Sequence, residues 1–132
     1  KNLVCIEDGK LKNMHANCRY AYYLGMKPTG VYSKISVQPG DMSFDDMKAH
    51  KGLYVVNFSD FQMDSLSGFF GGEIRLAYYN DGEKIVPVTG GSVNGTIIDA
   101  QKDFEFSKET QETSTFAGPK AILLKDISVA GK

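Results

Sequence analysis

The chain alternates between short apolar segments and clusters of turn-forming residues, a pattern typical of many short β-strands. Residues 53–58 give the strongest strand signal because they are rich in β-branched and aromatic side chains. The pairs Asp8-Gly9 and Asp81-Gly82 lie between such segments and predict two hairpin turns. Pro87 has no backbone N–H, so its segment is predicted to form an edge strand or a bulge. The other predicted strands are residues 3–6, 11–14, 35–37, 73–79, 84–88, 104–106, 121–124 and 127–129.

Helical signals are fewer and short. Residues 16–24 carry an apolar face with helical spacing, and Gly25 stands where such a helix would end. Ser43 is a predicted N-cap for a second helix over residues 43–49. Residues 96–103 fit either a strand or a short helix, because their periodicity favours neither.

Residues 59–72 are rich in Gly, Ser and Asp and predict a loop, yet this segment contains several large apolar side chains. Such residues indicate that the loop packs on the core or binds something. The run 121–124 is continuously apolar and predicts a buried final strand that pairs with an earlier part of the chain. The apolar residues of the 59–72 segment are Phe61, Met63, Leu66, Phe69 and Phe70.

The predicted elements add up to a mainly β fold. We expect an antiparallel β-sheet sandwich or barrel-like domain with one or two short helices. The 132 residues fit a single domain over residues 1–132, since domains commonly hold about 100–200 residues. Lys1 is not an initiator Met, so we expect the chain to be part of a larger protein.

Charge and cysteine content narrow the possible partners. The 15 basic and 16 acidic residues give a net charge of −1, which provides neither the basic excess expected for nucleic-acid binding nor a polybasic membrane anchor. No apolar run approaches the ~20 residues of a membrane span. Cys5 and Cys18 lack the spacing of a disulfide framework, and we expect both to be buried structural thiols in a reducing compartment.

The residues that could carry chemistry form no recognisable catalytic set. His15 and His50 lack further ligands at metal-binding spacing, although Cys18 lies three residues after His15. Residues 90–95 are glycine-rich but lack the lysine of a phosphate-binding loop. No serine lies in a nucleophile elbow, and the acidic residues stand mainly in turns or near helix starts. The sequence therefore assigns no catalytic, cofactor-binding or metal-binding residue, and a β-rich binding, structural or partner domain fits best.

The order of the motifs nevertheless resembles one family. Residues 4–11 (VCIEDGKL) resemble its IENGVL segment, and residues 38–43 (QPGDMS) resemble its PGD-S helix start. Residues 79–88 (YNDGEKIVPV) resemble its IENGEI-x-x-PV segment. The other matching segments are residues 21–30, 51–55, 64–70, 93–95 and 119–131. Together they resemble the C-terminal domain of the TldD/PmbA family, once called modulators of DNA gyrase.

The resemblance implies a function beyond the residues themselves. The family forms a cytoplasmic pair of subunits that degrades or processes unfolded peptides. One subunit carries zinc on an HExxxH helix and a Cys in a late glycine-rich loop, and the other has a similar fold without the metal ligands. Here residues 102–118 occupy that late interval and contain no Cys. The chain is therefore more similar to the metal-free, PmbA-like subunit, with a TldD-like subunit, the rest of its own protein and a peptide substrate as the implied partners.

Three functions follow as alternatives. The first is the C-terminal domain of a PmbA-like subunit without cofactor or catalytic residue in this chain, which helps to wall a peptidase chamber. The second is a free-standing β-domain that binds a small molecule or glycan through the 61–72 loop, and the third is a complete zinc peptidase domain. The candidate residues for contact with a partner or with the chamber are Phe61, Asp64, Phe69 and Phe70.

Overall fold

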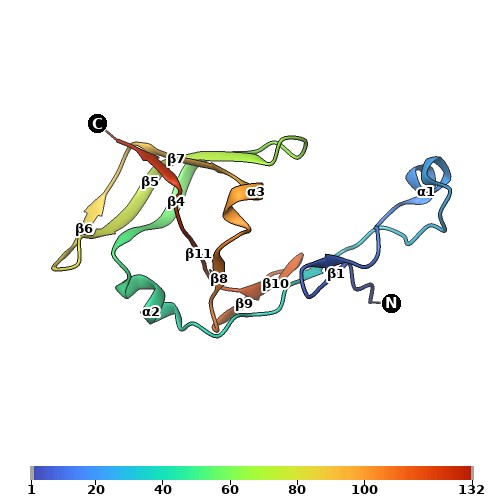
Figure 1. Ribbon diagram of the computed structural model, residues 1–132, viewed down its shortest axis with the longest axis horizontal. Helices are drawn as coiled ribbons and strands as arrows, with labels where there is room; N and C mark the ends of the chain where they lie inside the picture. The colour runs from blue at the N-terminus through green and yellow to red at the C-terminus, as the bar shows by residue number, and fades with distance from the viewer. Residues whose placement is uncertain (1, 132) are drawn as a thin grey trace. The chain divides into compact units, whose positions relative to one another are not determined.

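The computed structural model describes residues 2–131 and shows a mainly β protein with antiparallel strand pairs (Figure 1). This confirms the predicted fold class, with three short helices where one or two were expected. The sheets of residues 2–131 do not close into a barrel. The chain divides into two compact units, Lys1–Ile35 (unit 1) and Ser36–Lys132 (unit 2). No helix in the described residues is long and apolar enough to cross a membrane.

Unit 1 begins with the predicted hairpin. The strands β1 (Ile6–Glu7) and β2 (Lys10–Leu11) pair antiparallel, shorter than expected. Asp8 and Gly9 form the turn with φ angles of 51° and 69°. Two successive left-handed residues are what a tight type I′ hairpin turn requires, and Asp-Gly supplies them at low cost.

The predicted first helix is present as α1 (Cys18–Leu24). The Asn17 side chain accepts a hydrogen bond from the Tyr20 N–H at the start, and Gly25 ends the helix in the left-handed conformation. Only Ala21 of this helix is buried. Cys18 is exposed and Cys5 is half-buried, so the prediction of two buried thiols is wrong. Cys18 is exposed because α1 packs its small alanine inward and leaves its larger side chains in solvent.

Unit 2 is built on one antiparallel sheet. Its strands are β4 (Gly52–Met63), β5 (Phe69–Asn80), β6 (Ile85–Val88), β7 (Ser92–Thr96) and β12 (Ser128–Ala130). They lie in the order β12-β7-β5-β4, and β6 pairs with the second half of β5. Pro87 therefore lies in an outer strand, as predicted.

The core of this sheet is small. Ile74, Ala77 and Val93 form its buried cluster. The partly buried side chains that pack against the cluster are Leu53, Val55, Phe58, Val88 and Ile127. The core therefore draws on β4, β5, β6, β7 and the segment just before β12, and joins distant parts of the sequence.

The remaining elements of the chain are short. The second predicted helix is α2 (Phe44–Ala49), capped by the Ser43 hydroxyl, which also bonds the Asp46 carboxylate at 2.6 Å. Residues 96–103 fit either a strand or a short helix by sequence. In the structure this segment contains the helix α3 (Ile97–Ala100), with Thr96 as its cap. The other strands are β3 (Ile35–Ser36), β8 (Phe104–Phe106), β9 (Thr110–Glu112), β10 (Phe116–Pro119) and β11 (Ile122–Leu124).

The prediction of a loop over residues 59–72 is wrong. Strand β4 continues to Met63 and β5 begins at Phe69, so most of the segment forms a long hairpin. The Gly and Ser residues that indicated a loop are accommodated by register shifts between Val55 and Asp60 and by close ring packing over Gly72. Tertiary contacts thus override the local turn composition.

The C-terminal segment pairs with earlier strands, as predicted. Strand β11 pairs with β8, and β12 pairs with β7. The expectation that the run is buried on both faces is wrong, because Ile122 is 50% exposed and every residue of β12 is exposed. Strand β11 belongs to a two-stranded ribbon, which has no second layer to cover both faces.

Candidate functional site

The tip of the β4–β5 hairpin is held by Asp64. Its carboxylate accepts hydrogen bonds from the Leu66 N–H at 3.0 Å and from the Ser67 hydroxyl at 2.6 Å, and the Ser67 N–H lies at 3.3 Å. These donors, the Ser67 hydroxyl first, lower the pKa of Asp64. Both oxygens of Asp64 are therefore used inside the turn, and the residue orders the hairpin tip.

The aromatic residues of the hairpin divide between its two faces. Phe70 is only 5% exposed, and its ring stacks on that of Phe61 with centroids 6.2 Å apart. Phe61 also packs against Phe58 at 5.0 Å. Phe69 follows the alternation of the strand onto the opposite face, where it remains 48% exposed.

Two glycines make room for this ring cluster. A Cβ at Gly72 would lie 2.7 Å from the Phe58 ring and 2.9 Å from the Phe61 ring. A Cβ at Gly95 of the neighbouring strand would lie 2.9 Å from the Phe70 ring. The rings therefore rest directly on the backbone of the sheet, which explains glycine at both positions.

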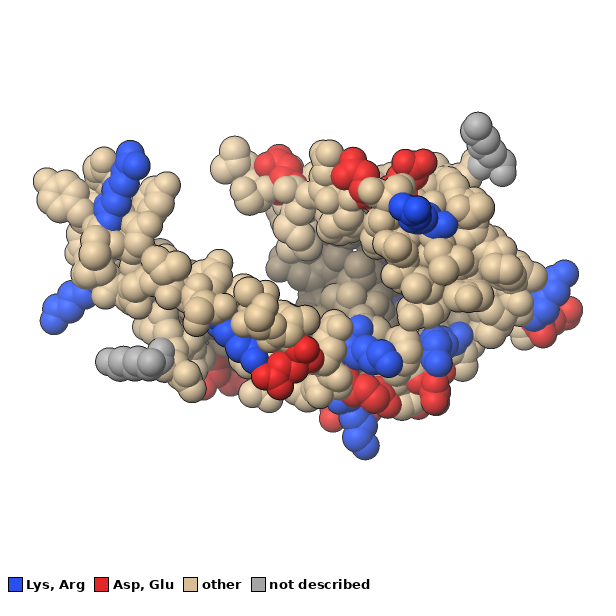
Figure 2. Space-filling view, turned by 180° about the vertical axis from the view of Figure 1, so that it is seen from behind, with Lys and Arg blue, Asp and Glu red and all other residues tan. Residues whose placement is uncertain are grey.

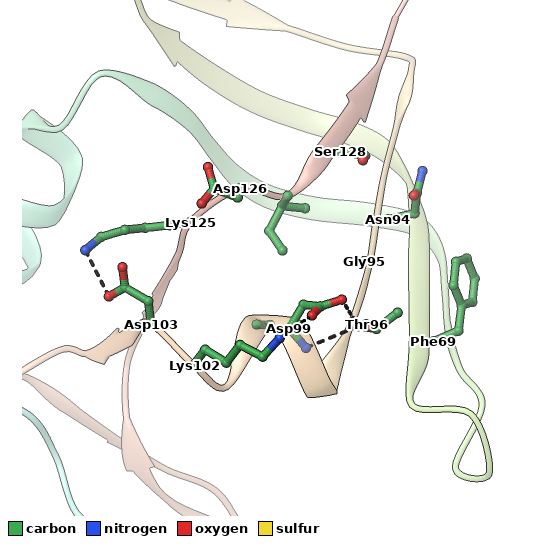
Figure 3. Close-up of a pocket in the computed structure, with 12 residues that line it drawn as sticks. Phe69, Asn94, Gly95, Thr96, Asp99, Lys102, Asp103, Lys125, Asp126 and Ser128 are labelled. Carbon is green, nitrogen blue, oxygen red and sulfur yellow. Dashed lines mark hydrogen bonds and ion pairs between the residues drawn. The ribbon is translucent and has the colours of Figure 1, made fainter.

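A cavity of about 570 Å³ lies beside Phe69 (Figure 3). Strand β7 contributes Asn94 and Thr96, and helix α3 closes one side. The Ile97 N–H bonds the Gly68 carbonyl at 2.8 Å, which fixes the start of α3 against the hairpin turn. The rest of the lining comes from residues 125–128, before and at the start of β12, and from Gly95, Asp99, Ala100, Lys102 and Asp103.

The charges at this cavity are mostly paired within the chain. Lys102 contacts Asp99 at 2.8 Å, and Lys125 contacts Asp103 at 3.0 Å (Figure 3). The Lys102 and Thr96 hydrogen bonds lower the pKa of Asp99, and the Asp103 hydrogen bond raises the pKa of Lys125. The cavity wall is thus a set of exposed ion pairs around an apolar patch of Phe69 and Ile127.

The model of the PmbA/TldA metallopeptidase C-terminal domain family matches residues 1–131. The chain belongs to this family. No curated protein matches the chain. The family assignment confirms the resemblance drawn from the motif order, and makes the chain a C-terminal domain of a PmbA/TldD-type, metallopeptidase-related protein.

Within this family domain, the late interval 102–118 has a defined structure. It runs from the end of α3 through β8 and the hairpin formed by β9 and β10. Ser107 is fully buried there, and its hydroxyl accepts the Ala121 N–H at 3.0 Å and donates to the Glu109 carbonyl at 2.8 Å. The two cysteines lie elsewhere, in unit 1.

The potential metal ligands lie apart from one another in the described residues. The His50 Nδ1 is 2.8 Å from the Asp46 carbonyl at the end of α2. The His15 ring packs edge-on against Tyr32 with centroids 4.5 Å apart, and its buried Nε2 has no hydrogen-bond partner among residues 2–131. No group of three or more His, Cys, Asp or Glu side chains within residues 2–131 is arranged to hold a metal ion.

The four predicted contact residues therefore have different surroundings. Phe61 and Phe70 lie together in the ring cluster, Asp64 orders the turn, and Phe69 faces the cavity. Sequence reasoning did not find the cavity walls from α3 and residues 125–128. The Thr96-x-x-Asp99 spacing is a capping-box-like signal that could have placed α3, because the Thr96 hydroxyl accepts the Asp99 N–H and bonds the Asp99 carboxylate.

Proposed function

We propose that this domain belongs to a PmbA-like subunit that carries no catalytic group in this chain. It pairs with a zinc-bearing TldD-like subunit and forms part of the wall around the site where that subunit cleaves unfolded peptides in the cytoplasm. The observation that carries this proposal is the interval 102–118. By the family resemblance drawn from the sequence, the metal-bearing subunits have a Cys-containing, glycine-rich loop here, whereas this chain has the β9–β10 hairpin and no Cys.

The extent of exposed surface supports a role in an assembly. The chain exposes 10251 Å². Two compact proteins with the sizes of unit 1 and unit 2 would together expose roughly 8,100 Å² by the scaling of surface with mass. The difference is about 2,100 Å², more than the ~800 Å² per partner of a standard protein–protein interface.

Much of this surface is apolar. The exposed large hydrophobic side chains of residues 2–131 include Leu66 at the hairpin tip, which is 96% exposed. On the face seen in Figure 2, charged side chains are separated by broad uncharged areas. An isolated soluble protein seldom leaves so many apolar groups in water, which favours burial of these surfaces against another chain or domain.

The proposal is tested by peptide cleavage with the full-length protein. An unfolded peptide is offered to this subunit alone, to its co-purified partner alone and to both together. We expect cleavage to require the partner and to increase when this subunit is added. Cleavage by this subunit alone at the rate of the pair would overturn the proposal.

The alternative of a free-standing binding domain gives a different result in the same preparation. It requires a bound small molecule or glycan and no protein partner. Co-purification of a second family subunit therefore supports the pairing, and a monomer that retains a ligand through purification contradicts it.

A further inference from the structure

Strand β4 forms one edge of the sheet in unit 2 along its whole length. It pairs with β5 from Gly52 to Met63 and stands last in the strand order. Its other edge receives no backbone hydrogen bond from any of residues 2–131. A long edge strand presents a row of unpaired N–H and C=O groups, and such a row is a template for pairing with another strand.

The first part of this edge lacks the features that usually protect an edge strand. Residues 52–56 (GLYVV) contain no charged residue and no proline. The register with β5 is regular from Gly52 to Val55, and the shifts that disturb the strand begin only after Val55. Charges, prolines and bulges are what keep an edge from pairing, so the stretch up to Val55 is open to another strand.

The other outer strands of this sheet are poorer partners for β4. Pro87 removes a backbone donor from the four-residue strand β6, and β12 has only three residues. A contact of β4 with either strand of another copy would also join two different surfaces, which builds open chains rather than a closed pair. Strand β4 of a second copy has the same length and the same free edge, and a twofold axis closes that contact.

The side-chain pattern of β4 is compatible with such a twofold pair. Leu53 and Val55 pack against the core cluster, whereas Tyr54 lies on the opposite face and stacks on its cross-strand neighbour Tyr78. In an antiparallel pair centred on Tyr54, Leu53 of one copy lies opposite Val55 of the other, and both point to the core face. Asp60 is the one charged residue of β4 and lies outside this stretch. The two copies therefore meet without like charges in contact.

We propose that β4 of this chain pairs antiparallel with β4 of a second copy, centred on Tyr54, so that the two sheets form one sheet across both copies. The contact is isologous, because each copy uses the same residues. It is separate from the pairing with a TldD-like subunit, since it joins two copies of the subunit that contains this chain. No residue of β4 lines the cavity beside Phe69, so the cavity stays free.

Single-cysteine cross-linking of the full-length protein tests the pairing, in a background with Cys5→Ser and Cys18→Ser. Cysteine replaces each of residues 53–57 in turn, and the yield of disulfide-linked dimer after mild oxidation is measured. We expect the highest yield at Tyr54→Cys, because only the residue on the twofold axis meets its own copy. The two residues 57 lie about 20 Å apart in this register, so Asn57→Cys should give a yield at least about tenfold lower.

The pattern over the five positions decides the outcome. Equal yields at all positions would indicate a parallel, in-register stack and overturn the proposal. A maximum at Asn57→Cys, or no cross-link at any position, would also overturn it.

A charge on the same edge provides a readout that does not depend on oxidation. Val56 is 48% exposed, and Val56→Lys places a charged side chain on this edge, as natural proteins do to prevent pairing. It should raise the dimer dissociation constant at least about tenfold. Ile85→Lys is the matched control, because Ile85 is an exposed apolar residue of the outer strand β6, and it should change the constant less than about twofold.

Analytical ultracentrifugation of the full-length variants measures both constants, and circular dichroism shows that each variant is folded. Equal changes in the two folded variants would contradict pairing through β4.

These readouts are independent of the proposed pairing with a TldD-like subunit. A self cross-link at position 54, with peptide cleavage that needs no partner, supports the β4 contact and contradicts that pairing. Cleavage that requires the partner, without a self cross-link, supports the pairing and overturns the β4 contact.

Discussion

Phe61 and Phe70 stack across the β4–β5 hairpin with their ring centroids 6.2 Å apart, and this contact fixes the arm that carries the candidate residues. Phe70 is buried while Phe61 is half exposed, so the stack joins the interior of the sheet to its surface. The neighbouring Phe69 lies on the other face. Phe70 thus stabilises the hairpin, whereas Phe69 is available to the cavity.

This division predicts different costs for two adjacent truncations. Phe70→Ala should lower the free energy of unfolding by about 3 kcal/mol, because it removes a buried ring and leaves a cavity. Phe69→Ala should lower it by less than about 1 kcal/mol, because that ring is largely in solvent. Denaturant unfolding of both variants gives the two values. Equal losses would show that the two faces of the hairpin are not distinguished as described.

Gly72 lies against the Phe58 and Phe61 rings, and its replacement should therefore lower the stability of the domain. Gly72→Ala places a methyl group within 3 Å of the Phe58 and Phe61 rings and should destabilise the domain by about 1–3 kcal/mol. Gly131→Ala is the matched control, because no atom lies within 4 Å of its added Cβ. Thermal unfolding of the two variants measures the difference. A Gly72→Ala protein as stable as the control would contradict the close packing over this strand.

Asp64 predicts a pH dependence with a definite sign. Its folded pKa lies below the ordinary value of 3.8, so its stabilising contribution is present above that pH and is lost as the pH falls through the folded pKa. Asp64→Asn should therefore be less stable than the wild type at pH 7, and the difference should shrink below pH ~3.8.

Denaturant midpoints across this pH range measure that effect. Ser67→Ala removes the hydroxyl that bonds the carboxylate and should reduce the pH dependence without abolishing it. A difference between the wild type and Asp64→Asn that stays constant down to pH 2 would argue against the role of Asp64 in the turn.

The C-terminal strands predict the result of a truncation. A chain that stops at Pro119 loses β11 and β12, and with them the pairing to β8 and β7 and the contact of Ile127 with the core. We expect this truncated chain to lose its cooperative thermal transition, because the core cluster is small. A transition near the original temperature would show that the last strands are peripheral.

Local signals predicted much of this fold, because they depend on near neighbours. The Asp8-Gly9 turn, the end of α1 at Gly25 and the Ser43 cap of α2 each follow from the conformational preference of a few residues. The β4–β5 hairpin could not be predicted in the same way. Its Gly and Ser residues favour a loop, and only the cross-strand packing of distant aromatic rings makes it a pair of strands.

Burial was harder to predict than secondary structure. The sequence suggested that Cys18 and Ile122 are covered, since apolar residues are usually inside. Both are exposed in the structure. The cavity beside Phe69 also combines α3 with residues 125–128, and no local pattern indicates that these distant segments meet. The four candidate residues were placed in a predicted loop, and the sequence did not show that this segment is a hairpin with two different faces.

The zinc content of each subunit in the co-purified full-length pair shows which of the two subunits carries the metal. The pair is dialysed, its subunits are separated, and each is measured by elemental analysis. We expect about one zinc per partner subunit and none on the subunit that contains this chain. About one zinc retained by the subunit containing this chain, with peptide cleavage by that subunit alone, would contradict it.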